Sequence, residues 1–140
     1  MKRKKRIWIG ASALAVAGLL AGNAFAHAPK TITIRHQLHG CHTWSFAGGR
    51  FSASLKVKID RDTVLVFVDN DMMPHKLVQL SGPKAALTTP NMRHMGAKAV
   101  AIFPMTGVYK FRTRAGEDYM KGMKTIGKDN VLRLTVTVTP

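Results

Sequence analysis

The densest group of chemically reactive side chains is the segment 36–44, which reads His-Gln-Leu-His-Gly-Cys-His-Thr-Trp. It places three histidines and the only cysteine of the sequence within seven residues. A thiolate together with imidazoles suits copper, and thioethers bind its Cu(I) state. The eight methionines of the chain add to this soft donor set. The segment therefore predicts a metal site, with copper as the metal.

The geometry of an extended chain limits which of these side chains act together. Alternate residues of a strand share a face, so His39 and Cys41 point the same way. His42 points away unless a bulge at Gly40 or the next residue turns it back. A site with two ligands from this segment and a site with three are both compatible with the sequence. The alternative interpretations are that Cys41 is a buried small hydrophobic residue and that His36 is an exposed strand histidine.

A second group of polar and sulfur-bearing residues follows the β-branched and aromatic run at 63–68. Residues 68–78 read Val-Asp-Asn-Asp-Met-Met-Pro-His-Lys-Leu-Val. His75 comes directly after Met-Pro, where it is either a metal ligand or only a turn residue. The pair Met72-Met73 supplies either thioether ligands or packing.

Three stretches of the sequence together resemble the cupredoxins, the blue-copper protein family. Residues 68–78 are similar to the family's Asn-x-Asp-x-x-Pro-His stretch, whose histidine, here His75, is the first copper ligand. Residues 101–111 are similar to the Phe-x-x-x-Gly-x-Tyr-x-Phe stretch that leads into the penultimate strand. Gly122-Met123 resembles the Gly-Met of the closing ligand loop. The resemblance covers residues 63–140 and implies a Greek-key sandwich with copper bound at one end.

The sequence departs from the family where the cysteine ligand is expected, two residues after the phenylalanine of Tyr-x-Phe. Thr113 occupies this position, and residues 114–119 contain no histidine. Tyr109, Phe111 and Thr113 share a strand face by alternation, so we expect Thr113 to point toward the interior. A hydroxyl does not replace a thiolate as a copper ligand, so the standard blue-copper site is not formed.

We therefore predict a relocated copper site, because chain-distant segments meet at the end of a sandwich. The predicted ligands are Cys41, His39 or His42, His75 and Met73, with Met72, Glu117 and Met123 as weaker candidates. A separate cluster of Met92, His94 and Met95 suits Cu(I), although packing under a sheet edge is the favoured interpretation.

Hydrophobic periodicity predicts strands throughout the chain. Apolar and polar residues alternate over 51–60 and over 132–139, which is typical of half-buried strands. The continuous run 63–68 predicts a central strand covered on both faces. Further strands are expected at 31–34, 76–80, 100–103 and 108–113, with the longest irregular segment at 81–98. No helical period is present, so the predicted fold is all-β, a small Greek-key β-sandwich or barrel.

The first residues have the pattern of a secretory signal peptide. Five basic residues precede the apolar run 7–20, and Ala24-Phe25-Ala26 forms a small-x-small cleavage signature. We therefore expect residues 1–26 to be removed and residues 27–140 to form one cupredoxin-like domain, periplasmic or extracellular. The expected mature chain has no integral membrane segment and does not meet cytoplasmic nucleic acid. A single exported cysteine cannot form an internal disulfide, which leaves a buried or metal-bound thiol or an intermolecular bridge.

Charge adds a weaker indication about partners. Removing residues 1–26 takes away five of 22 basic side chains and none of the 7 acidic ones, so the formal net charge falls from +15 to +10. This excess suits an acidic redox or copper-trafficking partner protein or an anionic surface, and it also serves solubility.

Three functions remain open from the sequence. The leading hypothesis is a copper-binding cupredoxin-like protein acting in electron transfer or copper handling. The second is a metal-free interaction module that keeps the sandwich without its ligands. The third is a copper carrier or oxidase that chelates the metal through the amine and imidazole of His27 once it is the first residue. No Ser-His-acid, paired-carboxylate or phosphate-loop pattern is present, so a non-enzymatic role is favoured.

Overall fold

The computed structural model describes residues 27–36, 42–115 and 131–140. These residues contain strands and no helices. The strands are β1 (Lys30–His36), β2 (His42–Phe46), β3 (Ser54–Asp60), β4 (Val64–Asp69), β5 (His75–Ser81), β6 (Ala86–Thr88), β7 (Asn91–Met92), β8 (Lys98–Ile102), β9 (Gly107–Ala115) and β10 (Val131–Thr139). No helix in this part of the chain has the length and apolar character needed to cross a membrane.

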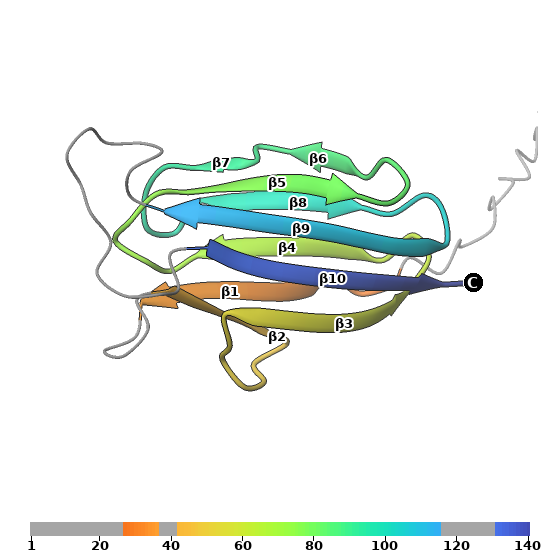
Figure 1. The fold of residues 1–140 in the computed structure, drawn as a ribbon, viewed down its shortest axis with the longest axis horizontal. Coiled ribbons are helices and arrows are strands. Elements are labelled where there is room, and N and C mark those ends of the chain that lie inside the picture. The colour runs from red at the N-terminus through yellow and green to blue at the C-terminus, as the bar shows by residue number, and fades with distance from the viewer. Residues whose placement is uncertain (1–26, 37–41, 116–130) are drawn as a thin grey trace, which may run out of the picture.

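The strands form two five-stranded sheets that stack as a sandwich (Figure 1). Sheet I has the order β2-β1-β4-β8-β6, and sheet II has the order β3-β10-β9-β5-β7. Two of the pairings are parallel, β1 with β4 and β3 with β10, and each joins strands that are distant in the sequence. The all-β sandwich predicted from the periodicity is confirmed.

The predicted strand positions hold with shifts at their ends. In β10, Leu132, Leu134, Val136 and Val138 are buried as the alternation requires. In β3 the strand begins at Ser54 rather than at residue 51, because residues 51–53 form only an isolated bridge at Ser52 to Trp44.

The run 63–68 forms β4, the middle strand of sheet I, so its predicted central position is confirmed. The prediction that both of its faces are covered is wrong. Leu65 and Phe67 point into the core, whereas Val64, Val66 and Val68 are only half-buried on the outer face. A β-branched run in a central strand therefore indicates cross-strand packing as well as burial.

The segment predicted to be irregular, 81–98, contains two short strands. β6 pairs with β8 at the edge of sheet I, and β7 pairs with β5 at the edge of sheet II. β2 was also not predicted, although residues 43–46 alternate polar and apolar side chains. Four successive residues of β2, 42–45, are buried, which a period of two does not anticipate.

An aromatic core joins the two sheets. Phe103 makes edge-to-face contacts with Tyr109 and Phe111, at centroid distances of 4.9 and 6.1 Å. Trp44 and Phe67 lie 6.4 Å apart in the same interior. The Tyr109 hydroxyl donates to the Met105 carbonyl oxygen at 2.6 Å, so the polar end of this buried ring has a hydrogen-bond partner.

Candidate metal centre

Four chain segments meet at one end of the sandwich. β1 ends at His36, β2 begins at His42, β4 ends at Asp69 and β5 begins at His75 (Figure 1). The antiparallel pairing of β1 and β2 sets His36 opposite His42, and the parallel pairing of β1 and β4 sets Ile34 opposite Asp69. Strand pairing thus brings His42 to Asp71, a carboxylate 29 residues away along the chain.

The short connection between β4 and β5 aims a carboxylate into this end. The backbone N–H of Asp71 donates to Asp69 Oδ1 at 3.0 Å, and the N–H of Met73 donates to Asp71 Oδ1 at 3.1 Å. The N–H of Asn70 donates to the Ile34 carbonyl at 2.8 Å. Aspartates favour such turns because their side chains bond the backbone two residues onward. The turns leave Asp71 Oδ2 directed at the histidines.

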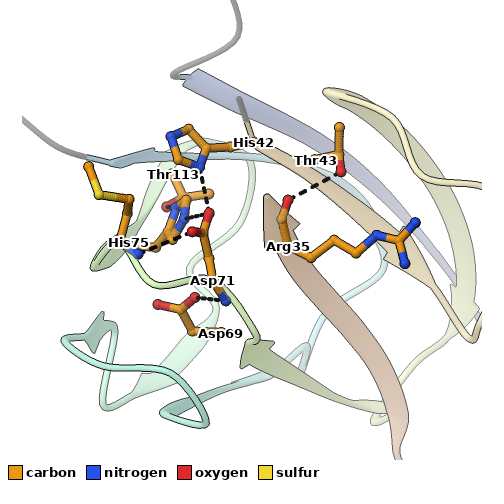
Figure 2. Close-up of polar contacts among 8 residues, drawn as sticks. Arg35, His42, Thr43, Asp69, Asp71, His75 and Thr113 are labelled. Atoms are coloured by element: carbon orange, nitrogen blue, oxygen red, sulfur yellow. Dashed lines mark hydrogen bonds and ion pairs between the residues drawn. The ribbon is translucent and has the colours of Figure 1, made fainter. Parts of the chain in front are cut away.

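Asp71 Oδ2 bridges two buried imidazoles (Figure 2). It lies 2.5 Å from His42 Nδ1 and 3.1 Å from His75 Nε2. The two rings are nearly perpendicular, with centroids 5.0 Å apart. None of the three side chains is more than 1 % exposed. We call these three residues the buried cluster.

Thr113 extends the buried cluster on the side of β9. Its Oγ1 lies 3.2 Å from His75 Nδ1, and its side chain is fully buried. The predicted inward orientation of Thr113 is therefore confirmed, and its hydroxyl occupies the place where the resemblance implies a thiolate. Thr113, His75 and Asp71 form a hydroxyl–imidazole–carboxylate chain like that of hydrolases, but full burial keeps a substrate carbonyl from the hydroxyl.

The protonation of the buried cluster follows from its hydrogen bonds. Burial acts to raise the pKa of Asp71, but hydrogen bonds from His42 and His75 outweigh it and hold this pKa well below its usual range. Burial lowers the pKa of His75, against the opposing effect of Asp71. Because a carboxylate only accepts, neutral His75 carries its proton on Nε2, and its Nδ1 accepts from the Thr113 hydroxyl.

His42 has a nitrogen without a partner. Its Nδ1 faces the carboxylate, and its Nε2 is buried with no hydrogen-bond partner among residues 27–36, 42–115 and 131–140. A proton on Nδ1 of a neutral imidazole leaves a lone pair on Nε2. Such a buried lone pair is costly unless something binds it.

A second carboxyl group lies beneath the buried cluster. Asp69 is fully buried, and its Oδ2 has no hydrogen-bond partner in the described part of the chain. Burial is the main cause that raises the pKa of Asp69 to about 7, and the charge of Asp71 adds to it. The pKa values of these two neighbouring carboxyl groups are therefore shifted in opposite directions, because only Asp71 receives side-chain hydrogen bonds from histidines.

Ligand atoms of His36, His42 and Asp71 all lie within 4.8 Å of one another. His36 is exposed, with its ring centroid 5.8 Å from that of buried His42. Neither His36 nor Asp71 was among the predicted ligands. The histidine density of 36–42 pointed to the first of them, but only the tertiary pairing reveals the second.

The structure places the predicted site residues in three groups. His42 and His75 come together in the buried cluster. Met72 is 83 % exposed and Met73 is half-buried. His27 is exposed and precedes β1, whose first residue lies about 20 Å along the strand from His36. The other candidates lie outside the described residues: His39, Cys41, Glu117 and Met123.

The methionine cluster of the 81–98 segment is divided. Met92 is part of the hydrophobic core, opposite His75 in the pairing of β7 with β5, which confirms its predicted packing role. His94 and Met95 are exposed.

Part of the buried cluster offers ligand atoms for a transition metal. Those of His42 and Asp71 lie close to His36, and His42 Nε2 has no partner within the described parts of the chain, whereas both ring nitrogens of His75 already make hydrogen bonds. Cys41 directly precedes His42 in the chain. Imidazole suits copper, zinc, iron and nickel alike, whereas a thiolate adds preference for copper or zinc. The choice of copper therefore depends on Cys41.

No protein-family model matches the chain, and no curated protein matches it in sequence. A purple cupredoxin from Nitrosopumilus maritimus is similar in structure, with 17% identity, a TM-score of 0.43, and coverage of 78% of this chain and 98% of that protein. A cysteine protease inhibitor from Entamoeba histolytica has 9% identity, a TM-score of 0.40 and coverage of 61% and 85%. A Cu(I) amicyanin variant has 14% identity, a TM-score of 0.37 and coverage of 78% and 82%. These values are too low to carry an argument about this chain.

Proposed function

We propose that this protein is an exported, cupredoxin-like copper-binding protein that acts in electron transfer or copper handling. The observation that carries the proposal is the buried cluster of His42, Asp71 and His75, which lies one residue along the chain from Cys41. The resemblance of 68–78 to the cupredoxin ligand stretch supports it, because His75 opens β5 at the end of the sandwich.

The residues of the buried cluster have separate tasks in this proposal. Asp71 holds both imidazoles in fixed orientations, as carboxylates do for metal-ligating histidines. His42 supplies its buried Nε2 as a metal ligand, and exposed His36 supplies a ligand nitrogen at the boundary between solvent and the interior. When bound, copper supplies one-electron redox chemistry. A rigid buried set suits electron transfer, whereas exposed His36 suits the capture and release needed for handling.

A metal-free interaction module is the second candidate. It is favoured by the hydrogen bonds that already satisfy Asp71 and His75 and by the presence of Thr113 in place of a cysteine. In that case the buried cluster acts as a polar core network that fixes the end of the sandwich.

A Cu(II) titration followed by visible absorption distinguishes these functions. We expect wild type to develop a sulfur-to-copper charge-transfer band, Cys41→Ser to lose it, and His42→Ala to bind copper more weakly. His27→Ala is the matched control, since it removes a histidine at the opposite end, and we expect it to leave band and affinity unchanged.

Other outcomes contradict the proposal in different ways. Unchanged copper binding in both Cys41→Ser and His42→Ala, with loss in His27→Ala, would place the metal at the amino-terminal histidine. Absence of copper binding by wild type would support the metal-free module.

A further inference from the structure

The outer face of sheet II carries a continuous set of basic side chains. β3, β10, β9 and β5 lie side by side in this sheet (Figure 1), and their outward positions alternate with the buried ones. Among the cations of this face whose burial the structure describes, all are exposed except the half-buried Arg112. We call this surface the basic face; its cations are Lys56, Lys58, Lys76, Lys110, Arg112 and Arg133.

Strand register sets these cations close to one another. Arg133 of β10 lies directly opposite Arg112 of β9, and Thr135 lies between Lys56 and Lys110. Adjacent strands are about 4.8 Å apart, and like charges directly opposite each other destabilise a sheet. Folding stability therefore does not explain this arrangement, whereas an anionic partner does.

Counter-charges from the protein are scarce on the basic face. The ion pairs among the described residues are the two within the buried cluster and that of Arg61 with Asp62. Asp69 and Asp71 are buried, so Asp60, the last residue of β3, is the one carboxylate that the described strands of sheet II present outward. Arg112 Nε has no hydrogen-bond partner in these parts of the chain.

Exposed aliphatic side chains adjoin the cations at one end of the face. Leu80 is 55 % exposed and Val108 is 49 % exposed, on the adjoining strands β5 and β9. Val108 lies opposite Thr137, next to the basic rows. A sheet face with cations and a few exposed aliphatic groups matches a planar anionic surface with an apolar interior.

We propose that the basic face docks on the surface of an anionic lipid bilayer. Lys and Arg contact the lipid headgroups, and Leu80 and Val108 reach the acyl boundary. This orientation leaves the buried cluster at the end of the sandwich, away from the docked face. The proposal uses no residue of the metal centre, so it stands or falls independently of copper binding.

Co-sedimentation with phosphatidylglycerol–phosphatidylcholine vesicles tests this surface. We expect wild type to bind these vesicles at low salt, to be released by high salt, and not to bind phosphatidylcholine alone. Each Lys or Arg near an anionic surface strengthens binding about fivefold. The combined change Lys56→Gln, Lys110→Gln and Arg133→Gln is therefore expected to weaken binding about a hundredfold.

A control variant of equal net charge keeps the test specific to this face. Lys30→Gln, Arg50→Gln and Lys98→Gln remove three exposed cations outside sheet II, and we expect a loss well below a hundredfold. An equal loss in both variants would overturn the proposal, because net charge alone would then explain binding. Circular dichroism establishes that both variants fold.

Leu80→Ser separates a bilayer from a soluble polyanion. This change leaves all charges in place, and we expect weaker vesicle binding with unchanged binding of duplex DNA, which serves as a polyanion probe. Failure of wild type to bind anionic vesicles would overturn the proposal. Duplex DNA binding lost only in the basic-face variant, without vesicle binding, would assign the surface to linear polyanions instead.

Discussion

Two regions of the sandwich are equally buried and chemically opposite. The aromatic core around Phe103, Tyr109 and Phe111 excludes water with rings in edge-to-face contact. The buried cluster excludes water equally well, but it consists of a charged carboxylate and two imidazoles, with the Thr113 hydroxyl beside it. Apolar burial stabilises the fold directly, whereas burial of polar groups costs free energy that hydrogen bonds only offset. The aromatic core therefore stabilises the fold by burial itself, whereas the stability of the cluster depends on its hydrogen bonds.

Truncating the core should have the largest effect on stability. Phe111→Ala removes a buried ring that contacts Phe103, and we expect the free energy of unfolding to fall by about 3–5 kcal/mol. Denaturant unfolding followed by circular dichroism measures this loss. A loss under about 1 kcal/mol would contradict the assignment of this ring to a tightly packed interior.

Neutralising the carboxylate of the buried cluster should have a smaller effect. Asp71→Asn keeps the shape but weakens two charge-assisted hydrogen bonds, so we expect a loss of about 2–3 kcal/mol at neutral pH. The pKa of Asp71 is depressed in the folded state, so its contribution is present above its ordinary pKa of 3.8 and declines as the pH falls further. Urea unfolding at pH 7 and at pH 3 should therefore show a smaller difference between variant and wild type at pH 3.

Asp69 is expected to act in the opposite direction. Its pKa is raised to about 7 in the folded state, so the folded protein holds a proton that the unfolded chain releases near pH 4. The contribution of Asp69 to the free energy of unfolding therefore declines as the pH rises from 4 through 7. Asp69→Asn mimics the protonated form, and we expect it to raise stability at pH 8 by about 1–2 kcal/mol and to change little at pH 4. Equal effects at both pH values would show that Asp69 titrates normally.

Removing the hydroxyl of Thr113 should have the smallest effect. Thr113→Val preserves volume and deletes the hydrogen bond to His75 Nδ1, with an expected loss of about 1 kcal/mol. Thr113→Ser retains the hydroxyl, so it serves as the control for that bond. Ring-nitrogen chemical shifts of His75 should change in the valine variant and stay close to wild type in the serine variant. Unchanged ring-nitrogen shifts in the valine variant would contradict the hydrogen bond between the Thr113 hydroxyl and His75 Nδ1.

The fold was largely predictable because alternation of apolar residues is a local signal. It located β3 and β10 and the inward orientation of Thr113. The buried cluster was only half predictable. His75 stood out through its sequence context, but Asp71 joins His42 only through the parallel pairing of β1 with β4, and no local pattern encodes that pairing. The burial of both faces of β2 over residues 42–45 was likewise not predictable, because its polar and apolar side chains alternate as in a strand with one exposed face.

The position of β10 within sheet II has a consequence for how the chain reaches its native state. β10 is the last strand in chain order, yet it lies between β3 and β9 and pairs with both. Its parallel partner β3 is about eighty residues earlier, so sheet II closes only when residues far apart in the sequence meet. Folds dominated by such long-range contacts take milliseconds to seconds to form. During synthesis, β3 and β9 each have an unpaired edge until β10 is available to pair with both. Sheet II is therefore completed only after β10 has been synthesised, and forms that lack β10 are the ones most exposed to aggregation.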